Sequence, residues 1–196
     1  MPEVRHLVDF SQPRNESYPL PWADIKEVWL RYWDQSKPLL LDKSPPLLFQ
    51  GAEAIEHFRP ARLIAMVRNP YVHCEALMRR DGLPAREAAE RSVHSLLYQK
   101  RNLRGLADIL LIRYEDLVDD PAHTRERLLA FLPALQSLDI DRKFTSHYRR
   151  SSFTITDMNV GKIERIAAPD LRAISAVLAP HAELLEFFGY DLHTLG

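Results

Sequence analysis

Two cations, each followed by a small polar residue and a proline, predict an anion-binding site. Lys43 precedes a Ser-Pro pair, and Arg68 precedes an Asn-Pro pair. Both pairs are typical of the first residues of a helix, where backbone N–H groups without partners point outward. The helix dipole opposes a cation at that end unless an anion lies between the two. The pattern therefore favours a phosphate or sulfate ligand, although solvent-exposed cations would give the same sequence.

Apolar runs immediately before both cations predict the strands that would position them. Residues 39–42 and 63–67 lack polar–apolar alternation, and a third run of this kind precedes Arg113. A helical pattern follows each run, with N-caps expected at Ser44, Asn69 and Asp120. Strands of this kind, joined by helices, are typical of a parallel sheet buried on both faces. We therefore expect an α/β fold that binds its ligand beyond the carboxyl ends of the strands.

Helices elsewhere in the chain are predicted from the spacing of apolar residues. Residues 84–103 fit one long helix, and residues 169–188 fit one or two helices interrupted at Pro180. Residues 135–168 show little periodicity, and a stretch this long without clear elements is typical of a functional or mobile loop. An amphipathic helix before the first strand is predicted from an apolar stripe of Trp22, Ile25, Trp29 and Tyr32.

Length and composition indicate a single globular domain over residues 1–196. The chain is 46% hydrophobic and 27% charged, which excludes fibrous and disordered classes. Cys74, the single cysteine, cannot form an internal disulfide, and no CxxC or HExxH spacing suggests a metal site. No apolar run approaches the roughly 18 residues of a membrane span, and residues 1–10 lack a signal-peptide core. We therefore expect a cytoplasmic protein without a membrane partner.

The distribution of charge indicates a small polyanionic ligand rather than a nucleic acid. The net charge is −1, which argues against neutralising many phosphates at once. Residues 59–113 nevertheless carry 11 basic against 5 acidic side chains, and residues 142–165 carry 6 against 2. These two basic stretches in an otherwise acidic chain favour one concentrated pocket. Solvated helix faces explain many of the same arginines, so both interpretations stay open.

Several motifs, taken in order, resemble the sulfotransferase family over about residues 22–192. They are Asp-Lys-Ser-Pro at 42–45, Phe-Arg-Pro at 58–60, the run ending in Arg-Asn-Pro at 62–70, and Ile-Arg-Tyr-Glu-Asp-Leu at 112–117. The resemblance implies a P-loop-like α/β fold. It also implies transfer of a sulfo group from 3'-phosphoadenosine 5'-phosphosulfate (PAPS) to a hydroxyl or amine. The acceptor, a small molecule, carbohydrate or peptide, is not readable from these motifs.

Five residues of this chain are candidates for the site, and the resemblance implies a role for three of them, Arg68, Lys43 and Lys162. Arg68, with its neighbour Asn69, is similar to the residues that bind the 3'-phosphate of the donor. Lys43 corresponds to a lysine near the sulfo group. Lys162, in an Asn-Val-Gly-Lys turn, is similar to a late segment that closes over the nucleotide. Position along the chain, rather than the resemblance, makes His73, one turn after Arg68, a candidate base or phosphate contact, with His147 as the other histidine beside a basic stretch; an isolated helical histidine is more often structural. In this family the carboxylates of residues 114–117 are mainly architectural.

Three departures from the family pattern predict a shortened fold. The serine that shares the 3'-phosphate is replaced by Ala76, and the catalytic histidine of phenol and steroid enzymes by Pro45. The first glycine is Gly51, so a Gly-rich phosphosulfate loop before that position is excluded. The likeness is therefore to the Lys-Ser-Pro branch, often bacterial or Golgi, and we expect either a missing N-terminal segment or a homo-oligomer.

A non-catalytic module is the alternative to an enzyme. A shortened sulfotransferase-like chain could bind a nucleotide weakly or serve as one half of an assembly. A P-loop kinase or other NTPase is disfavoured because the GxxxxGK[ST] motif is absent. No metal is expected in the reaction. Loss of a phosphate cradle would remove contacts worth on the order of 1.5 to 3 kcal/mol each.

Overall fold

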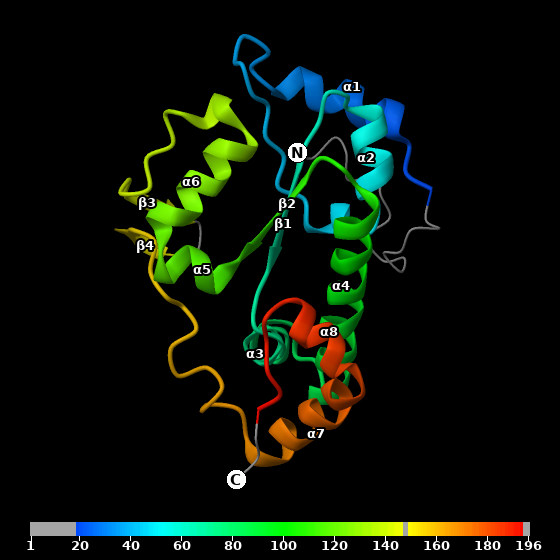
Figure 1. Ribbon diagram of the computed structural model, residues 1–196, viewed down its shortest axis with the longest axis vertical. Helices are drawn as coiled ribbons and strands as arrows, with labels where there is room; N and C mark the ends of the chain where they lie inside the picture. The colour runs from blue at the N-terminus through cyan, green and yellow to red at the C-terminus, as the bar shows by residue number, and fades with distance from the viewer. Residues whose placement is uncertain (1–18, 147–148, 194–196) are drawn as a thin grey trace.

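The central sheet joins two parallel strands, β1 (Leu63–Val67) and β2 (Ile109–Arg113), in a computed structural model of the chain (Figure 1). Both predicted strands are confirmed. Val67 pairs with Arg113 at the end of the register, so the two carboxyl ends lie side by side. The chain that leaves β1 and the chain that leaves β2 therefore start next to each other, which is the arrangement that brings Arg68 close to residues 114–117.

The predicted strand over residues 39–42 is wrong. The structure describes residues 19–146 and 149–193, and in these ranges the run has no strand partner. Leu41 is 80% exposed. A run of three apolar residues between prolines gives the same pattern whether or not a neighbouring strand is available to pair with it. The segment leads instead into a short 3-10 helix, η2 (Pro45–Leu48), so Lys43 does not end a strand.

Two long helices follow β1 and form the main packing layer. In α3 (Pro70–Asp81), the predicted N-cap is confirmed because the Asn69 side chain accepts a hydrogen bond from Tyr71 N at 2.9 Å. The predicted helix over residues 84–103 is observed as α4 (Ala85–Gly105), which packs against α3. Arg68 and Asn69 thus lie between the end of β1 and a helix with a defined start.

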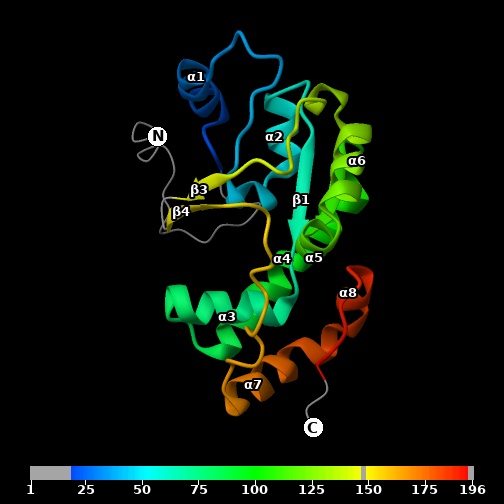
Figure 2. The ribbon, with the colours of Figure 1, turned by 90° about the vertical axis from the view of Figure 1, so that its left-hand side faces the viewer.

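The C-terminal helices complete this layer. They are α7 (Ala168–Leu178), the 3-10 turn η4 (Ala179–His181) and α8 (Ala182–Phe187), with the predicted interruption at Pro180. Figure 2 shows β1 leading into α3, with α7 and α8 at the end of the molecule that carries the C-terminus. The core between these elements is formed by buried apolar side chains that include Val67, Tyr71, Cys74, Ala88, Leu96, Ile174, Leu178, Leu185 and Phe188.

Shorter helices follow β2. The strand runs directly into α5 (Tyr114–Asp119), and α6 (Pro121–Phe131) begins at the predicted cap, where Asp120 accepts from His123 N at 2.9 Å. A 3-10 turn, η3 (Pro133–Leu135), and an antiparallel pair, β3 (Phe144–Ser146) and β4 (Arg149–Phe153), come next. The predicted loop over residues 135–168 therefore contains a small hairpin before the segment that reaches the site.

A second apolar cluster lies at the other end of the molecule (Figure 1). It joins the predicted amphipathic helix, α1 (Trp22–Tyr32), to α2 (Gly51–His57). Three of the four stripe residues are buried, whereas Tyr32 at the end of the helix is 49% exposed. The buried members of the cluster are Trp22, Ile25, Trp29 and Ala54.

The sheet is not covered on both faces, contrary to the prediction. Ala65 and Val67 of β1 are each 4% exposed, whereas Ile64 and Met66, on the opposite face, are 41% and 49% exposed. Successive side chains of a strand point to opposite faces, and Val67 lies in the apolar core together with residues of α3 and α4. An apolar run read from sequence does not distinguish a fully covered strand from a half-covered one.

Candidate functional site

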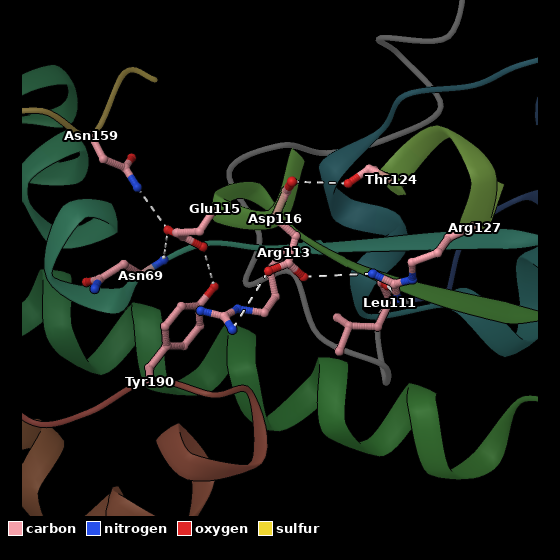
Figure 3. Close-up of polar contacts among 9 residues, drawn as sticks. All are labelled: Asn69, Leu111, Arg113, Glu115, Asp116, Thr124, Arg127, Asn159 and Tyr190. Carbon is pink, nitrogen blue, oxygen red and sulfur yellow. Dashed lines mark hydrogen bonds and ion pairs between the residues drawn. The ribbon is translucent and has the colours of Figure 1, made fainter. Parts of the chain in front are cut away.

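Glu115 joins four parts of the chain at the carboxyl ends of the two strands (Figure 3). It lies in the first turn of α5, next to the residues that follow β1. Its Oε1 accepts hydrogen bonds from Asn69 N and from Asn159 Nδ2, both at 2.9 Å. Its Oε2 accepts from the hydroxyl of Tyr190 at 2.8 Å. This is the architectural role that the family resemblance implies for the carboxylates of residues 114–117.

Arg68 is fixed in direction by contacts that leave one of its donors unused. Its Nε donates to Asn159 Oδ1 at 2.6 Å, and its guanidinium carbon lies 4.2 Å from the centre of the Tyr114 ring. Its Nη2 is buried and has no hydrogen-bond partner in the described part of the chain. Buried donors without partners are uncommon because the lost hydration is costly. The geometry therefore suits an anion that supplies the missing acceptor.

The expectation of free backbone amides at the start of α3 is wrong. The Asn69 side chain accepts from Tyr71 N at 2.9 Å and from Val72 N at 3.4 Å. The backbone N–H of Asn69 is itself bound to Glu115. The chain thus supplies both the helix cap and a negative charge at this helix end, which satisfies the dipole without a ligand. An anion at this helix end would have to be bound by cationic side chains rather than by free amides.

The predicted loop packs onto this site through Tyr114. The Tyr114 hydroxyl donates to the carbonyl of Thr156 at 3.1 Å and accepts from Met158 N at 2.8 Å. The turn that follows is closed by a hydrogen bond from Lys162 N to Asn159 O at 3.0 Å, and Gly161 has a φ of 67°. A positive φ of this size favours glycine, so the turn that carries Asn159 has a defined shape.

Lys162 reaches the interior rather than the solvent. Its Nζ lies 3.8 Å from Glu75 Oε2, and the two side chains are 10% and 8% exposed. Glu75 Oε1 also accepts from Arg79 Nε at 2.9 Å. Burial lowers the pKa of Lys162, and the nearby positive charge of Arg68 adds to this lowering, while Glu75 opposes it. The structure thus attaches the loop to α3 by a buried ion pair.

The two candidate catalytic residues, His73 and Lys43, are placed differently. His73 Nδ1 lies 3.2 Å from the hydroxyl of Ser92 on α4. Burial lowers the pKa of His73, with further lowering by Arg80 and Arg68, so the neutral imidazole is favoured. Lys43 is exposed, and no hydrogen bond or ion pair between described residues joins it to the Arg68 cluster. His147 lies outside the described residues.

The structure brings together Arg68, Asn69 and Lys162, and adds residues that sequence reasoning missed. Asn159 was noted only as part of the turn, and its bridging position has no local signal because Arg68 is 91 residues away. Tyr190 likewise gave no signal in the sequence. A cavity of about 290 Å³ lies beside it, lined in part by Asn69, Arg113 and Glu115.

No group of three or more His, Cys, Asp or Glu side chains within the described ranges is arranged to hold a metal ion. None of the helices in those ranges has both the length and the apolarity to cross a membrane.

Comparison with known proteins identifies the class. The model of the sulfotransferase family matches residues 3–134, so the chain belongs to the sulfotransferase family. It is similar to the omega-hydroxy-beta-dihydromenaquinone-9 sulfotransferase Stf3 of Mycobacterium bovis and to that of Mycobacterium tuberculosis. Each is 28% identical over 203 residues, which cover 86% of this chain and 47% of the relative. The chain thus spans about half the length of the curated relatives that it matches. No solved structure matches it.

Proposed function

We propose that the chain binds PAPS and transfers its sulfo group to a hydroxyl or amine of a small-molecule acceptor. The observation that carries the proposal is Arg68, a cation held by Asn159 and Tyr114 whose buried Nη2 has no acceptor among the described residues. A guanidinium binds a phosphate through two parallel N–H donors. Because the contacts of Arg68 fix one edge of its guanidinium, the remaining donors can bind a phosphate from one direction. Membership of the sulfotransferase family supports this choice of anion.

Each candidate residue has a role in this proposal that its contacts allow. Arg68 binds the 3'-phosphate of the nucleotide. The Nδ2 of Asn69 is its remaining polar group, because its Oδ1 and backbone N already have partners, and it donates to the same phosphate. Lys162 holds the turn that covers Arg68 by pairing with Glu75. Because Nη2 is buried, we propose that the side chains beside it move aside when the nucleotide enters, while the contact between Arg68 and Asn159 is kept.

Lys43 and His73 belong to the transfer step in this proposal. The bond between sulfur and the phosphate oxygen of PAPS breaks while sulfur bonds to the acceptor oxygen or nitrogen. Lys43 neutralises the charge that develops on the sulfo and phosphate oxygens. His73, kept neutral by burial, accepts the proton that leaves the acceptor through the nitrogen that does not face Ser92. The nucleotide leaves as 3'-phosphoadenosine 5'-phosphate (PAP). A hydroxyl acceptor is favoured by the relatives, whose name describes an omega-hydroxy compound.

Binding of PAP, measured by calorimetry, tests the donor site. We expect PAP to bind and Arg68→Ala to weaken it by about 10- to 100-fold, the effect of losing a hydrogen bond to a charged group. Adenosine 5'-monophosphate lacks the 3'-phosphate, so its affinity should be nearly the same for both proteins. The matched control is Arg86→Ala, an exposed arginine paired with Glu90 on α4. Absence of heat at millimolar PAP, or equal loss for both nucleotides, would contradict the proposed site.

A radiolabelled PAPS transfer assay with a panel of hydroxylated and amine acceptors tests the reaction. The non-catalytic module remains the second candidate, and it is favoured by the absence of any contact between Lys43 and the Arg68 cluster in the described residues. If PAP binds but no acceptor is sulfated, the second candidate is supported. If transfer occurs, Lys43→Ala should lower its rate while leaving PAP affinity and the unfolding midpoint almost unchanged, because the side chain is exposed.

A further inference from the structure

We infer that Glu115 and Tyr190 are positioning residues for Arg68, acting through the side-chain amide of Asn159. The effect of these residues on nucleotide binding rests on the proposed function. Their effect on the orientation of Arg68 rests on the contacts alone. Figure 3 shows the Glu115 carboxylate between Asn159 on one side and the Tyr190 hydroxyl on the other.

The orientation of the Asn159 amide is set by Glu115. An asparagine amide carries an acceptor on one side and a donor on the other. Its Nδ2 donates to Glu115 Oε1 at 2.9 Å, and an ionised carboxylate can only accept. A flipped amide would place Oδ1 against the carboxylate and Nδ2 against the N–H of Arg68, which are two repulsive contacts. Glu115 therefore decides that the oxygen of Asn159 faces Arg68.

Tyr190 and the backbone of Asn69 fix Glu115 in turn. The Tyr190 hydroxyl donates to Oε2 at 2.8 Å, and Asn69 N donates to Oε1 at 2.9 Å. Tyr190 is 5% exposed, and its ring lies 4.8 Å from the Arg113 guanidinium. Burial and the adjacent carboxylate raise the pKa of Tyr190, so the hydroxyl remains a donor at neutral pH. The carboxylate thus has little freedom to rotate.

The end of this series of contacts is the orientation of the guanidinium. Asn159 Oδ1 accepts a hydrogen bond from Arg68 Nε at 2.6 Å, and the guanidinium carbon lies 4.2 Å from the centre of the Tyr114 ring. The hydrogen bond to Asn159 fixes the Nε edge of the guanidinium, and the Tyr114 ring fixes its plane. Nη2 therefore points in a single direction. Residues from α5 and from the segment after α8 thereby define the geometry of a cation that follows β1.

The N–H resonance of Arg68 Nε, observed by NMR, tests the inference without any ligand. The resonance is assigned by its loss in Arg68→Lys. In the wild type we expect a resolved resonance that exchanges slowly with water. In Asn159→Ala and Glu115→Ala we expect it to exchange rapidly and to overlap with the signals of the exposed arginines. Glu115→Gln should retain it, because the glutamine oxygen can accept from Asn69 and Asn159 while the Tyr190 hydroxyl accepts from its amide. The matched control is Asp119→Ala, an exposed residue on the same helix.

Affinity for PAP gives the second readout. Glu115→Ala should weaken PAP binding about 10-fold, Tyr190→Phe by less, and Glu115→Gln by no more than about 3-fold, since a displaced guanidinium loses part of one charged hydrogen bond. In the Arg68→Ala background, Glu115→Ala should add no further loss. Circular dichroism identifies variants that fail to fold. If Glu115→Ala fails to fold, Tyr190→Phe is the milder substitution that tests the same series of contacts.

Two results would overturn the inference. One is an unchanged Arg68 Nε resonance in both Asn159→Ala and Glu115→Ala. The other is a loss of PAP affinity from Glu115→Ala that is equally large with and without Arg68, since this would indicate a general structural effect. Failure of the wild type to bind PAP would refute the proposed donor site, while the resonance would still decide the positioning role.

Discussion

Lys162 and Glu75 form an ion pair in the interior, with Nζ 3.8 Å from Oε2, and so connect the predicted loop to α3. The partners are not equivalent. Glu75 contacts a second cation, because Arg79 Nε donates to its other oxygen at 2.9 Å. For Lys162, Glu75 is the paired carboxylate among the described residues. Removing one partner of a buried pair costs more than replacing both, because the remaining charge is left unpaired.

Glu75→Met should therefore destabilise the fold more than Lys162→Met. We expect the first to lower the free energy of unfolding by about 3 kcal/mol, since it strands Lys162, and the second by less, since Arg79 remains beside Glu75. The double variant should recover part of the loss. Urea denaturation of the three variants measures the difference, and equal single-variant effects with simple additivity would contradict it.

Asn69 and Asp120 are equivalent as helix caps but not as site residues. Each accepts a hydrogen bond from the backbone at the start of its helix, at 2.9 Å in both cases. Replacement of either by alanine should lower the free energy of unfolding by about 1 kcal/mol. Only Asn69→Ala should also weaken PAP binding, because Asp120 lies at the start of α6. If calorimetry gives the same PAP affinity for both variants, the donor role of Asn69 is refuted.

The partly buried His73 predicts how stability changes in weak acid. Its pKa lies below the ordinary value of 6.5 because burial, and then Arg80 and Arg68, disfavour the charged ring. As the pH falls below about 6.5, the unfolded chain therefore binds a proton that the folded chain resists, and stability decreases. His73→Gln should lose less stability between about pH 7 and pH 5. Chemical denaturation at several pH values checks this, and parallel curves for the two proteins would show that His73 is not responsible.

The local parts of the fold could be predicted because their signals lie within a few residues. The Asn69 and Asp120 caps each precede a proline, and both were located correctly along with β1 and β2. The segment at residues 39–42 failed because a strand is defined by its neighbour as well as by its own residues. Leu41, at 80% exposure, has no such neighbour in the described chain.

The residues of the candidate site were predicted only in part. Arg68 and Lys162 were identified from motifs, but the atoms that orient them come from distant positions. Asn159 is 91 residues from Arg68, and Tyr190 is 75 residues from Glu115. Pairing across such separations is decided by how α5, the loop and the C-terminal segment pack together, and one sequence carries no local pattern for it. The role of Glu115 as an architectural carboxylate was expected from the family, although its partners were not.

Two glycines provide a final test of how closely the C-terminal segment fits the site. Gly189, next to Tyr190, has a φ of 71°, and an added Cβ would lie 2.9 Å from Arg113 Nη1. Gly105, at the end of α4, has open space around the same position. Gly189→Ala should therefore destabilise the protein by about 1 to 2 kcal/mol, because the left-handed conformation is strained for alanine. Gly105→Ala should instead stabilise it by about 0.5 kcal/mol by restricting the unfolded chain. Thermal unfolding of both variants decides this, and a Gly189→Ala protein as stable as the wild type would mean that residue 189 does not need the left-handed conformation.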